Sequence, residues 1–452
     1  MTADAAWREL EDALGEALLS DPLRVEEFSR DASRALPNGA PRGVVEARSV
    51  DDVRTAVLWA NVHGVPVSVR GAGTGLSGGA VAYAGGLVVS LAALTDIIDI
   101  DPAARTAVVQ PGVLVATLDA AANRYGLMYA PDPVSAEWCT VGGSVATNAG
   151  GMRCLAHGVT RDAVTGLQLV LGDGRLLRTG SQTRKNSTGY DLTGLFVGSE
   201  GTLGVITEVT VRLVPVPAGS RRTFRAEFSD LRDAGAAVLA VMSSPITPEL
   251  LELLDANCLE LIERHFPGTV EPGSRATLVG QVVGLTADAD AAELVRLCLE
   301  AGAVSASASE DSDLLESRRR INPALSAEGL AASSDIAVPL RRLADMFDEI
   351  DRIAASFDVR VNTFAHAGDG NLHPALNLTE DTERERERVE LVLDEITRAA
   401  VRLGGVVSGE HGVGSLKVDL AREQFDPIAA ELFADLKSLF DPRGVLSPGR
   451  AV

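Results

Sequence analysis

Cysteine is scarce in this chain, and its spacing excludes two common uses of the residue. The four cysteines, Cys139, Cys154, Cys258 and Cys298, lie far apart and form no CxxC pair. A disulfide framework or a cysteine-held iron–sulfur cluster needs closer groups, so neither is predicted. Long apolar runs are also missing, since no stretch approaches the roughly 20 apolar residues that span a bilayer.

Basic residues are outnumbered by acidic ones. The chain has 41 Lys and Arg against 63 Asp and Glu, a net charge of −22. A surface of that sign repels nucleic acid and anionic lipid, so an anionic substrate must meet a local positive site. The first twenty residues lack a basic and an apolar signal region, and they are expected to form an amphipathic helix. We therefore expect a cytoplasmic protein, and peripheral association with a membrane stays open.

The first half of the chain reads as short strands separated by glycines. Residues 1–35 are expected to be helical, and residues 44–71 follow a strand, helix, strand pattern. From 71 to 215 short apolar runs predict strands, and the turn at 172–174 predicts a hairpin. The segment VPVPAG at 214–219 is expected to be a linker.

The second half has stronger helical periodicity. Helices are expected over 234–245, 248–266, 287–303 and 380–405, and a strand over 276–284. Residues 335–357 are expected to form a strand and then a helix that begins near Pro339.

Residues 70–79, RGAGTGLSGG, contain five glycines and follow a predicted strand. Small residues let backbone N–H groups approach a ligand, and successive N–H groups can form an anion nest that suits a pyrophosphate. A flexible loop is the alternative. Two further loop-like clusters, 131–153 and 195–207, are ordinary turns or parts of the same site. One long ligand lying across several loops explains all three clusters.

Gly73, Gly75 and Gly78 also satisfy the GxGxxG pattern of a nicotinamide site. That motif needs a helix directly after it, so that the helix N-terminus meets the phosphates. Here AVAYAGGLVVSL follows, and no helix of useful length fits it. A Rossmann site is therefore not favoured.

Three of the six histidines lie in two short motifs, FAHAGDGNLHP at 364–374 and VVSGEHGVG at 406–414. His366 and His373 flank a predicted turn, and a hairpin would set them across from each other on one face, with Cβ atoms about 5 Å apart. With Glu410 they would form a mixed nitrogen and oxygen set for Zn²⁺ or Mn²⁺. A hydrogen-bonded turn without metal is the alternative.

Glu410 and His411 are adjacent, and in an extended segment their side chains would point to opposite faces. One could then bind metal while the other faces the substrate. A histidine side chain suits proton transfer at neutral pH. His63, His157 and His265 are isolated and are expected to be structural.

Three segments together resemble a known family. They are PVSVRGAGTGLSGGAV, PDPVSAEWCTVGGSVATNAGGMRCLAHG and GSEGTLGVITEVTVRLVP. They are similar to the FAD-binding domain of the vanillyl-alcohol-oxidase type, in the branch of D-lactate dehydrogenases, glycolate oxidase flavin subunits and D-2-hydroxyglutarate dehydrogenases. The resemblance runs over about residues 30–450.

The resemblance implies an α+β fold with three parts. Residues 1–217 would form a two-subdomain FAD-binding domain of the PCMH type, and 218–408 an α+β substrate (cap) domain with an antiparallel sheet. Residues 409–452 would return to the FAD site. FAD should be non-covalent, because residues 70–79 contain no histidine or cysteine. The implied FAD contacts are Arg70, Gly71, Ala72, Gly73, Thr74, Gly75, Leu76, Ser77, Gly78, Pro131, Thr140, Gly143, Thr147, Asn148, Gly150, Gly201, Gly204 and Ile206.

The resemblance also implies roles in catalysis. It assigns His366, His373 and Glu410 to a metal and His411 to the catalytic base. Arg318, one of three consecutive arginines on a predicted helix, would bind the substrate carboxylate, with surface arginines as the alternative. The expected reaction oxidises a 2-hydroxy acid: a metal acidifies the hydroxyl, the base takes its proton, and hydride passes to flavin N5.

Departures from the family pattern narrow the substrate. D-2-hydroxyglutarate dehydrogenases carry lysine at the position of Ser333 and asparagine at that of Ala375, so a short acid such as D-lactate or glycolate is favoured here. His157 and Ser447 replace a tyrosine and an asparagine near the cofactor, which is expected to weaken FAD contacts.

The rival functions differ in their partners. A glycolate oxidase flavin subunit would pass electrons to a separate iron–sulfur protein. Otherwise the acceptor is a quinone, a cytochrome or an electron-transfer protein, and a homodimer stays open. An ether-lipid synthase would use FAD without net redox, and a flavin-binding protein without activity is the last alternative.

Overall fold

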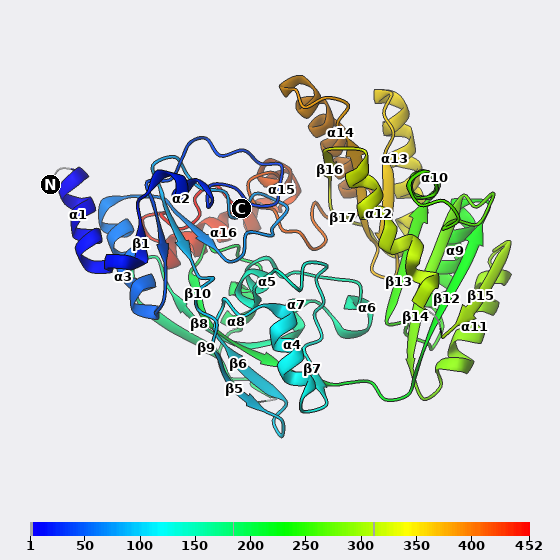
Figure 1. The fold of residues 1–452 in the computed structure, drawn as a ribbon, viewed down its shortest axis with the longest axis horizontal. Coiled ribbons are helices and arrows are strands. Elements are labelled where there is room, and N and C mark those ends of the chain that lie inside the picture. Colours follow the sequence, from blue (N-terminus) through cyan, green and yellow to red (C-terminus); the bar gives the residue numbers. More distant parts are fainter. Residues whose placement is uncertain (1–2, 184, 311) are drawn as a thin grey trace. The chain divides into compact units, whose positions relative to one another are not determined.

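The computed structural model describes residues 3–183, 185–310 and 312–452. The chain divides into two compact units, each drawn in Figure 1. Unit 1 consists of Met1–Gly151, Gly158–Val216 and Glu410–Val452, and unit 2 of Met152–His157 and Pro217–Gly409. Helices and sheets are mixed in both units, and the predicted α+β class is confirmed.

The first sheet of unit 1 is mostly parallel. Its order is β1-β2-β4-β3, in which β2, β4 and β3 run parallel and β1 pairs antiparallel with β2. The strands are β1 Leu18–Leu19, β2 Gly43–Glu46, β3 Val67–Arg70 and β4 Leu87–Ser90. Helix α3 (Val50–His63) connects β2 to β3 and packs with α1 (Ala3–Leu14) over one core, in which the Trp7 and Trp59 rings meet edge to face. The glycine-rich loop leaves the end of β3.

The second sheet of unit 1 is antiparallel, in the order β5-β6-β10-β8-β9. Its strands are β5 Ile97–Asp101, β6 Thr106–Val109, β8 Val164–Val170, β9 Leu176–Gly180 and β10 Val205–Arg212. A separate two-stranded antiparallel ribbon pairs β7 Leu127–Met128 with β11 Val214–Pro215. Buried residues of this sheet form one core with α4 Val115–Asn123, α5 Val141–Thr147 and α8 Leu192–Phe196. The short helices α2 Pro22–Glu26 and α7 Thr160–Ala163 complete this part.

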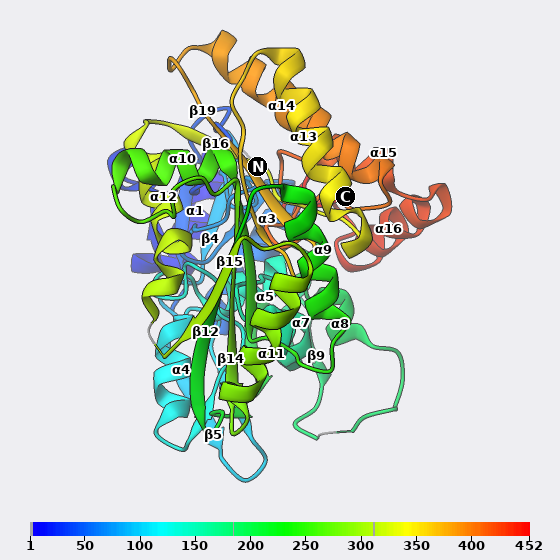
Figure 2. The ribbon, with the colours of Figure 1, turned by 90° about the vertical axis from the view of Figure 1, so that its right-hand side faces the viewer.

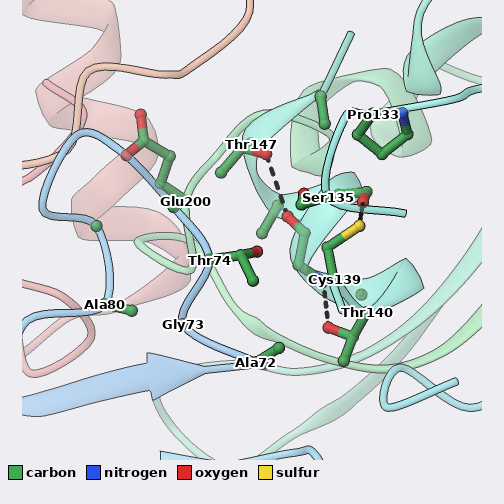
Figure 3. A pocket seen from close by; sticks show the side chains of 18 of the residues that line it. Ala72, Gly73, Thr74, Ala80, Pro133, Ser135, Cys139, Thr140, Thr147 and Glu200 are labelled. Carbon is green, nitrogen blue, oxygen red and sulfur yellow. Dashed lines mark hydrogen bonds between the residues drawn. The ribbon is translucent and has the colours of Figure 1, made fainter. Parts of the chain in front are cut away.

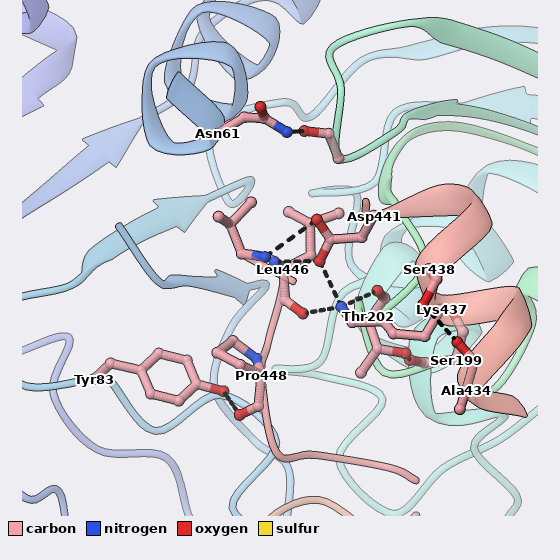
Figure 4. A network of polar contacts seen from close by, with 12 residues as sticks. Asn61, Tyr83, Ser199, Thr202, Ala434, Lys437, Ser438, Asp441, Leu446 and Pro448 are labelled. Atoms are coloured by element: carbon pink, nitrogen blue, oxygen red, sulfur yellow. Dashed lines mark hydrogen bonds and ion pairs between the residues drawn. The ribbon is translucent and has the colours of Figure 1, made fainter. Parts of the chain in front are cut away.

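The chain's end belongs to unit 1, through α15 (Val418–Gln424) and α16 (Pro427–Phe440). Figure 4 shows how Lys437 of α16 is tied to the tail. Its Nζ donates to the carbonyls of Thr202 (2.7 Å) and Leu446 (2.6 Å) and to Oδ2 of Asp441 (2.6 Å). Asp441 is buried and also accepts from the backbone N–H of Leu446. The network fixes the tail beside the strand and turn around Thr202.

Unit 2 is one antiparallel sheet in the order β15-β12-β14-β13-β18-β19-β16, with β17 also pairing to β19. The strands are β12 Ser220–Phe228, β13 Leu250–Asp255, β14 Ala276–Gly284, β15 Ser305–Ser309, β16 Ala331–Ser333, β17 Ile336–Ala337, β18 Asn362–His366 and β19 Asn371–Asn377. Helix α6 (Cys154–His157) also belongs to this unit.

Helices cover both faces of this sheet, as Figure 2 shows for α10 and α12 on one side and α9 and α11 on the other. The larger core lies under α9 Leu231–Met242, α11 Ala287–Glu300, α13 Leu343–Phe357 and α14 Glu383–Arg402. The smaller core lies under α10 Ala256–His265 and α12 Glu316–Ala327. Among the described residues, no helix combines the length and apolar composition that a membrane crossing needs.

The strand, helix, strand pattern of 44–71 and the hairpin at 172–174 are confirmed. Three local predictions are wrong. Residues 3–35 are not continuously helical, because a 3-10 turn at Gly15–Ala17 and strand β1 separate α1 from α2, and no helix follows Glu26 in this range. The predicted helix at 248–266 begins as strand β13, because its six residues are all buried between β14 and β18. The loop predicted at 131–153 contains helix α5, which Thr140 caps by accepting from Gly143 N–H.

Candidate functional site

The loop after β3 forms one wall of a cleft of about 330 Å³ in unit 1. Figure 3 shows loop residues Gly73 and Thr74 facing the segment that carries Cys139 and Thr140. The cleft is lined by residues within 69–80 on the loop side, by residues within 133–151 on the helix α5 side, and by Glu200, Gly201, Gly204 and Ile206. The three glycine-rich clusters of the sequence therefore meet at one cavity.

The loop is held by its carbonyl groups. Gly73, Ser77 and Gly79 accept hydrogen bonds at their carbonyl oxygens from Ala32 N, Ser415 N and the Arg450 guanidinium. Among the described residues, no hydrogen bond uses a backbone N–H of 71–79. These N–H groups are thus available to an anionic ligand, as a pyrophosphate nest requires.

The close approach of the loop to helix α5 requires glycine. A Cβ atom at Gly71 would lie 2.4 Å from Oγ1 of Thr140, and Gly73 has a φ of +75°. At Gly75 the result is different, since a Cβ there would meet no protein atom within 4 Å. The cleft, its backbone donors and the space beside Gly75 fit an extended dinucleotide such as FAD.

Glu200 fixes residues 410–414, the part of the second histidine motif that belongs to unit 1, beside this cleft. Its two carboxylate oxygens accept from the backbone N–H groups of Val413 and Gly414, each at 2.7 Å. Burial raises the pKa of Glu200 above its ordinary value, and the two N–H donors oppose that shift. Ser77 of the loop donates to the carbonyl of His411 at 3.1 Å. Glu410 and His411 consequently line the same cleft as the glycine-rich loop.

The expectation that Glu410 and His411 point to opposite faces is wrong. Nε2 of His411 lies 3.8 Å from Oε1 of Glu410. The cause is local, because residues 409–411 form bends rather than a strand. A Cβ atom on Gly150 would lie 2.4 Å from Oε2 of Glu410, so that glycine leaves room for the carboxylate.

Most of the expected FAD contacts line the cleft, and four do not. Arg70 donates to the carbonyl of Arg30, and Asn148 accepts from Arg161 N. Gly78 packs against Ser415, and Pro131 is buried without lining the cleft. The expected FAD contacts did not include these lining residues: Val69, Ala80, Leu91, Pro111, Pro133, Val134, Ser135, Trp138, Cys139, Gly142, Ser144, Ala146, Ala149, Gly151 and Glu200.

In unit 2, His366 and His373 lie on the β18–β19 hairpin. The register pairs His366 with Asn371 and Phe364 with His373, so the histidines are diagonal neighbours rather than directly opposite. They share one face of the sheet, with ring centroids 5.1 Å apart and planes at 84°. Both are buried, at 4% and 3% exposure.

Each histidine lies beside a fully buried carboxylate. Nδ1 of His366 lies 2.7 Å from Oε1 of Glu252, and Nδ1 of His373 lies 3.9 Å from Oδ1 of Asp335. Asp335 also accepts from Asn371 Nδ2 and Ser408 Oγ, at 2.7 and 2.8 Å. A buried imidazole pair, one of them with a carboxylate at hydrogen-bond distance from Nδ1, is a donor set that suits a divalent metal. The residues present therefore fit a metal.

Arg318 is also held by Glu252. Its Nε lies 2.6 Å from Oε2 of Glu252, and its guanidinium lies 4.7 Å from the centre of the Phe364 ring. Of the three consecutive arginines only Arg318 is buried, at 6% exposure. Burial opposes the ionised form of Glu252, but His366 and Arg318 outweigh it and hold its pKa below the ordinary value.

The cleft of unit 1 fits a flavin dinucleotide, and the family matches give the class of protein. Residues 41–180 match the family described as "FAD binding domain", and residues 218–451 match "FAD linked oxidases, C-terminal domain". The chain belongs to this FAD-linked oxidase family, and it is an FAD-dependent oxidoreductase.

Relatives are similar over nearly their whole length. The glycolate oxidase subunit GlcD of Bacillus subtilis is 38% identical over 417 residues, which cover 91% of this chain and 88% of that protein. A D-lactate dehydrogenase of Anaerostipes hadrus is 33% identical over 449 residues, covering 96% and 94%. The structure of p-cresol methylhydroxylase with bound substrate matches with a TM-score of 0.81 at 18% identity, covering 99% and 96%. At that identity it shows the shared fold.

Proposed function

We propose that this protein oxidises a small D-2-hydroxy acid, D-lactate or glycolate, to the 2-oxo acid. The observation that carries the proposal is that His411 lies in the wall of the cleft that fits FAD. Bound FAD would supply the acceptor for the hydride, which carries both electrons of the oxidation. The names of the relatives, a glycolate oxidase subunit and a D-lactate dehydrogenase, support this substrate class.

His411 is the proposed base that takes the hydroxyl proton of the substrate. Its backbone carbonyl accepts from Ser77 Oγ, and Glu200 accepts from the backbone N–H groups of Val413 and Gly414, so the segment that carries the imidazole is anchored to the glycine-rich loop. These bonds fix the backbone on which the imidazole stands, and general-base catalysis requires such a positioned side chain.

His366 and His373 are the proposed protein ligands of a divalent metal, Zn²⁺ or Mn²⁺. Glu410, proposed from the sequence as the third ligand, belongs to unit 1. Such a metal supplies Lewis-acid polarisation of the hydroxyl and carboxylate oxygens. Arg318, the buried arginine of helix α12, is the proposed partner of the substrate carboxylate, which brings the positive charge that an acidic protein must provide locally.

The substrate size is proposed from two small residues. Ser333 of β16 is the direct cross-strand partner of Ala375 of β19, so the two positions share one face of the sheet. In D-2-hydroxyglutarate dehydrogenases, which this chain resembles, these positions carry lysine and asparagine for a second carboxylate. With serine and alanine, a monocarboxylate is the better fit.

The test is anaerobic flavin reduction by a panel of D- and L-2-hydroxy acids, read as bleaching of flavin absorbance. We expect bleaching by D-lactate or glycolate and slower bleaching by D-2-hydroxyglutarate. His411→Ala should retain FAD and lose the fast phase. Reduction by L-acids alone would refute the stereochemistry, and an unchanged rate in His411→Ala would refute the base.

The alternative functions predict different experimental results. A glycolate oxidase flavin subunit requires an iron–sulfur partner, which should co-purify with the protein from its native cells. A transferase of the ether-lipid synthase type would show no net flavin reduction with any hydroxy acid and no metal requirement.

A further inference from the structure

Glu252 occupies a central position on the histidine-bearing face of unit 2. Strand β13 pairs with β18 so that Glu252 lies directly opposite His366, on the same face of the sheet. The side chain is fully buried, at 0% exposure. It is one carboxylate with two partners, since Oε1 contacts Nδ1 of His366 and Oε2 accepts from Nε of Arg318.

The contact with His366 fixes the state of that ring. A carboxylate at Nδ1 favours the tautomer with its proton there, which leaves Nε2 as the lone-pair nitrogen. A metal ligand needs this nitrogen unprotonated and held at a fixed angle. Because both the imidazole and the carboxylate are buried, water does not compete for Nδ1.

The contact with Arg318 fixes a cation. Glu252 accepts from Nε, and the guanidinium lies over the Phe364 ring, so two contacts hold the cation in place. Burial of a guanidinium without a counter-charge costs much free energy. The carboxylate of Glu252 offsets that cost for Arg318.

We propose that Glu252 is a positioning residue that holds His366 as a metal ligand and Arg318 as the carboxylate-binding cation, and so couples the two groups. This inference rests on the proposed function, because it assumes the metal and carboxylate roles of these two residues. Loss of the carboxylate should therefore weaken the metal and the substrate acid together. An ion pair with only a structural role would lower stability and leave both affinities unchanged.

The chain offers a matched control on the same sheet. Glu227 of β12 is also buried, at 3% exposure, and accepts from Nε of Arg225 and from the hydroxyls of Ser274 and Thr277. Strand β14 separates β12 from β13. Glu227→Gln removes a comparable buried glutamate–arginine pair without touching a histidine.

The experiment compares wild type, Glu252→Gln, Glu252→Asp and Glu227→Gln as FAD-loaded, metal-stripped enzymes. Zn²⁺ and Mn²⁺ affinities are measured by competition with a chelator of known affinity. The affinity for oxalate, a two-carbon dicarboxylate analogue of the substrate, is read from the flavin spectrum. We expect Glu252→Gln to bind metal roughly 10–100-fold more weakly, the usual effect of losing a carboxylate behind a ligating histidine. The affinity of Glu252→Gln for oxalate should fall by about 10-fold or more.

Glu252→Asp keeps the charge and both acceptor oxygens and should recover part of each affinity. It also serves as the test variant if Glu252→Gln does not fold. Glu227→Gln should melt at a lower temperature and keep both affinities. Equal losses in Glu227→Gln, or unchanged affinities in both Glu252 variants, would overturn the inference while the proposed function stands. Wild type that binds no metal and reduces no flavin would overturn both.

Discussion

At the scale of single residues, the glycines of the 71–79 loop differ in what surrounds their missing side chains. A Cβ at Gly71 would press against Thr140, whereas a Cβ at Gly75 would meet only the cavity that Gly75 lines. The first glycine therefore serves the packing of the protein, and the second leaves space for the cofactor. The two positions can be separated by experiment.

Gly75→Val should leave the apoprotein folded, with its unfolding free energy within about 0.5 kcal/mol of wild type. Its FAD affinity should fall by at least about 10-fold, because the new methyl groups enter the cofactor's space. Gly71→Ala should lose stability in the apoprotein, by roughly 1–3 kcal/mol of overpacking. FAD content by absorbance and urea denaturation give the two values, and a Gly75→Val protein that keeps a full complement of FAD would contradict the assignment.

Asp255 is a buried carboxyl whose titration affects stability. Burial raises its pKa from the ordinary 3.8 to about 7, against hydrogen bonds from Cys258 N and Thr363 N that lower it, and Asp351 raises it further. The folded state therefore binds a proton that the unfolded state has released between these two values. The stabilising contribution is complete below pH 3.8 and is lost as pH rises through about 7.

Urea denaturation of wild type and Asp255→Asn from pH 4 to 8 tests this linkage. Asn cannot titrate, so its stability should fall less over that range, by a difference on the order of a few kcal/mol at 1.36 kcal/mol per pKa unit. The slopes are compared, because Asn also changes one hydrogen bond and hence the baseline. Parallel slopes in the two proteins would show that Asp255 is ionised throughout.

At the scale of elements, α16 is anchored by one half-buried cation. Lys437 joins Thr202, Leu446 and Asp441, and burial lowers its pKa below the ordinary value. Thr202 lies in the turn between two residues of the cleft wall, Gly201 and Gly204. The network therefore connects the C-terminal helix to the FAD site.

Lys437→Met should lower the free energy of unfolding by roughly 3–5 kcal/mol, because it leaves Asp441 buried without its cation. FAD affinity should fall as well, since the turn at 201–204 loses its anchor. Arg443→Met, on an exposed turn, removes the same charge and should change stability by less than about 0.5 kcal/mol. Thermal denaturation and FAD titration of both variants check this, and equal effects in the two would exclude the network as the cause.

Strand β13 shows where local sequence reasoning stops. Its residues LLELLD have high helix propensity, and the sequence predicts a helix there. In the structure they are buried on both faces between β14 and β18, and this tertiary environment outweighs propensity. Because the segment is predicted as a helix, Glu252 is read from the sequence as an ordinary helix residue and not as a buried partner of His366.

The same limit applies to the site. Short spacing predicted the glycine-rich loop and the paired histidines, because those residues are close in the chain. Glu200 acts on Val413, 213 residues away, and Glu252 acts on His366, 114 residues away. Partners at such separations are set by sheet register and by the return of the tail, which no local pattern encodes. Glu200 lies inside the glycine-rich motif GSEGTLG. A charged residue between glycines indicates a buried carboxylate that binds backbone N–H groups, and this signal could have identified it.

At the scale of the whole molecule, the two units have separate hydrophobic cores. Unit 1 has its cores around the β10 sheet and around Trp7 and Trp59, and unit 2 has its cores on the two faces of one sheet. Chains of this kind often unfold in more than one step. The candidate FAD cleft is made only of unit 1 residues, and the histidine pair only of unit 2 residues.

Calorimetry should therefore resolve two unfolding transitions that respond to different ligands. Lys437→Met should lower the transition of unit 1 and Glu227→Gln that of unit 2, which assigns them. Added FAD at 100 times its Kd contributes about 2.7 kcal/mol to the unit that binds it, or roughly 5–10 °C. The transition lowered by Lys437→Met should rise by that amount, and Gly75→Val should abolish the rise. If FAD instead raises the transition that Glu227→Gln lowers, the cofactor does not bind where the glycine-rich loop meets helix α5.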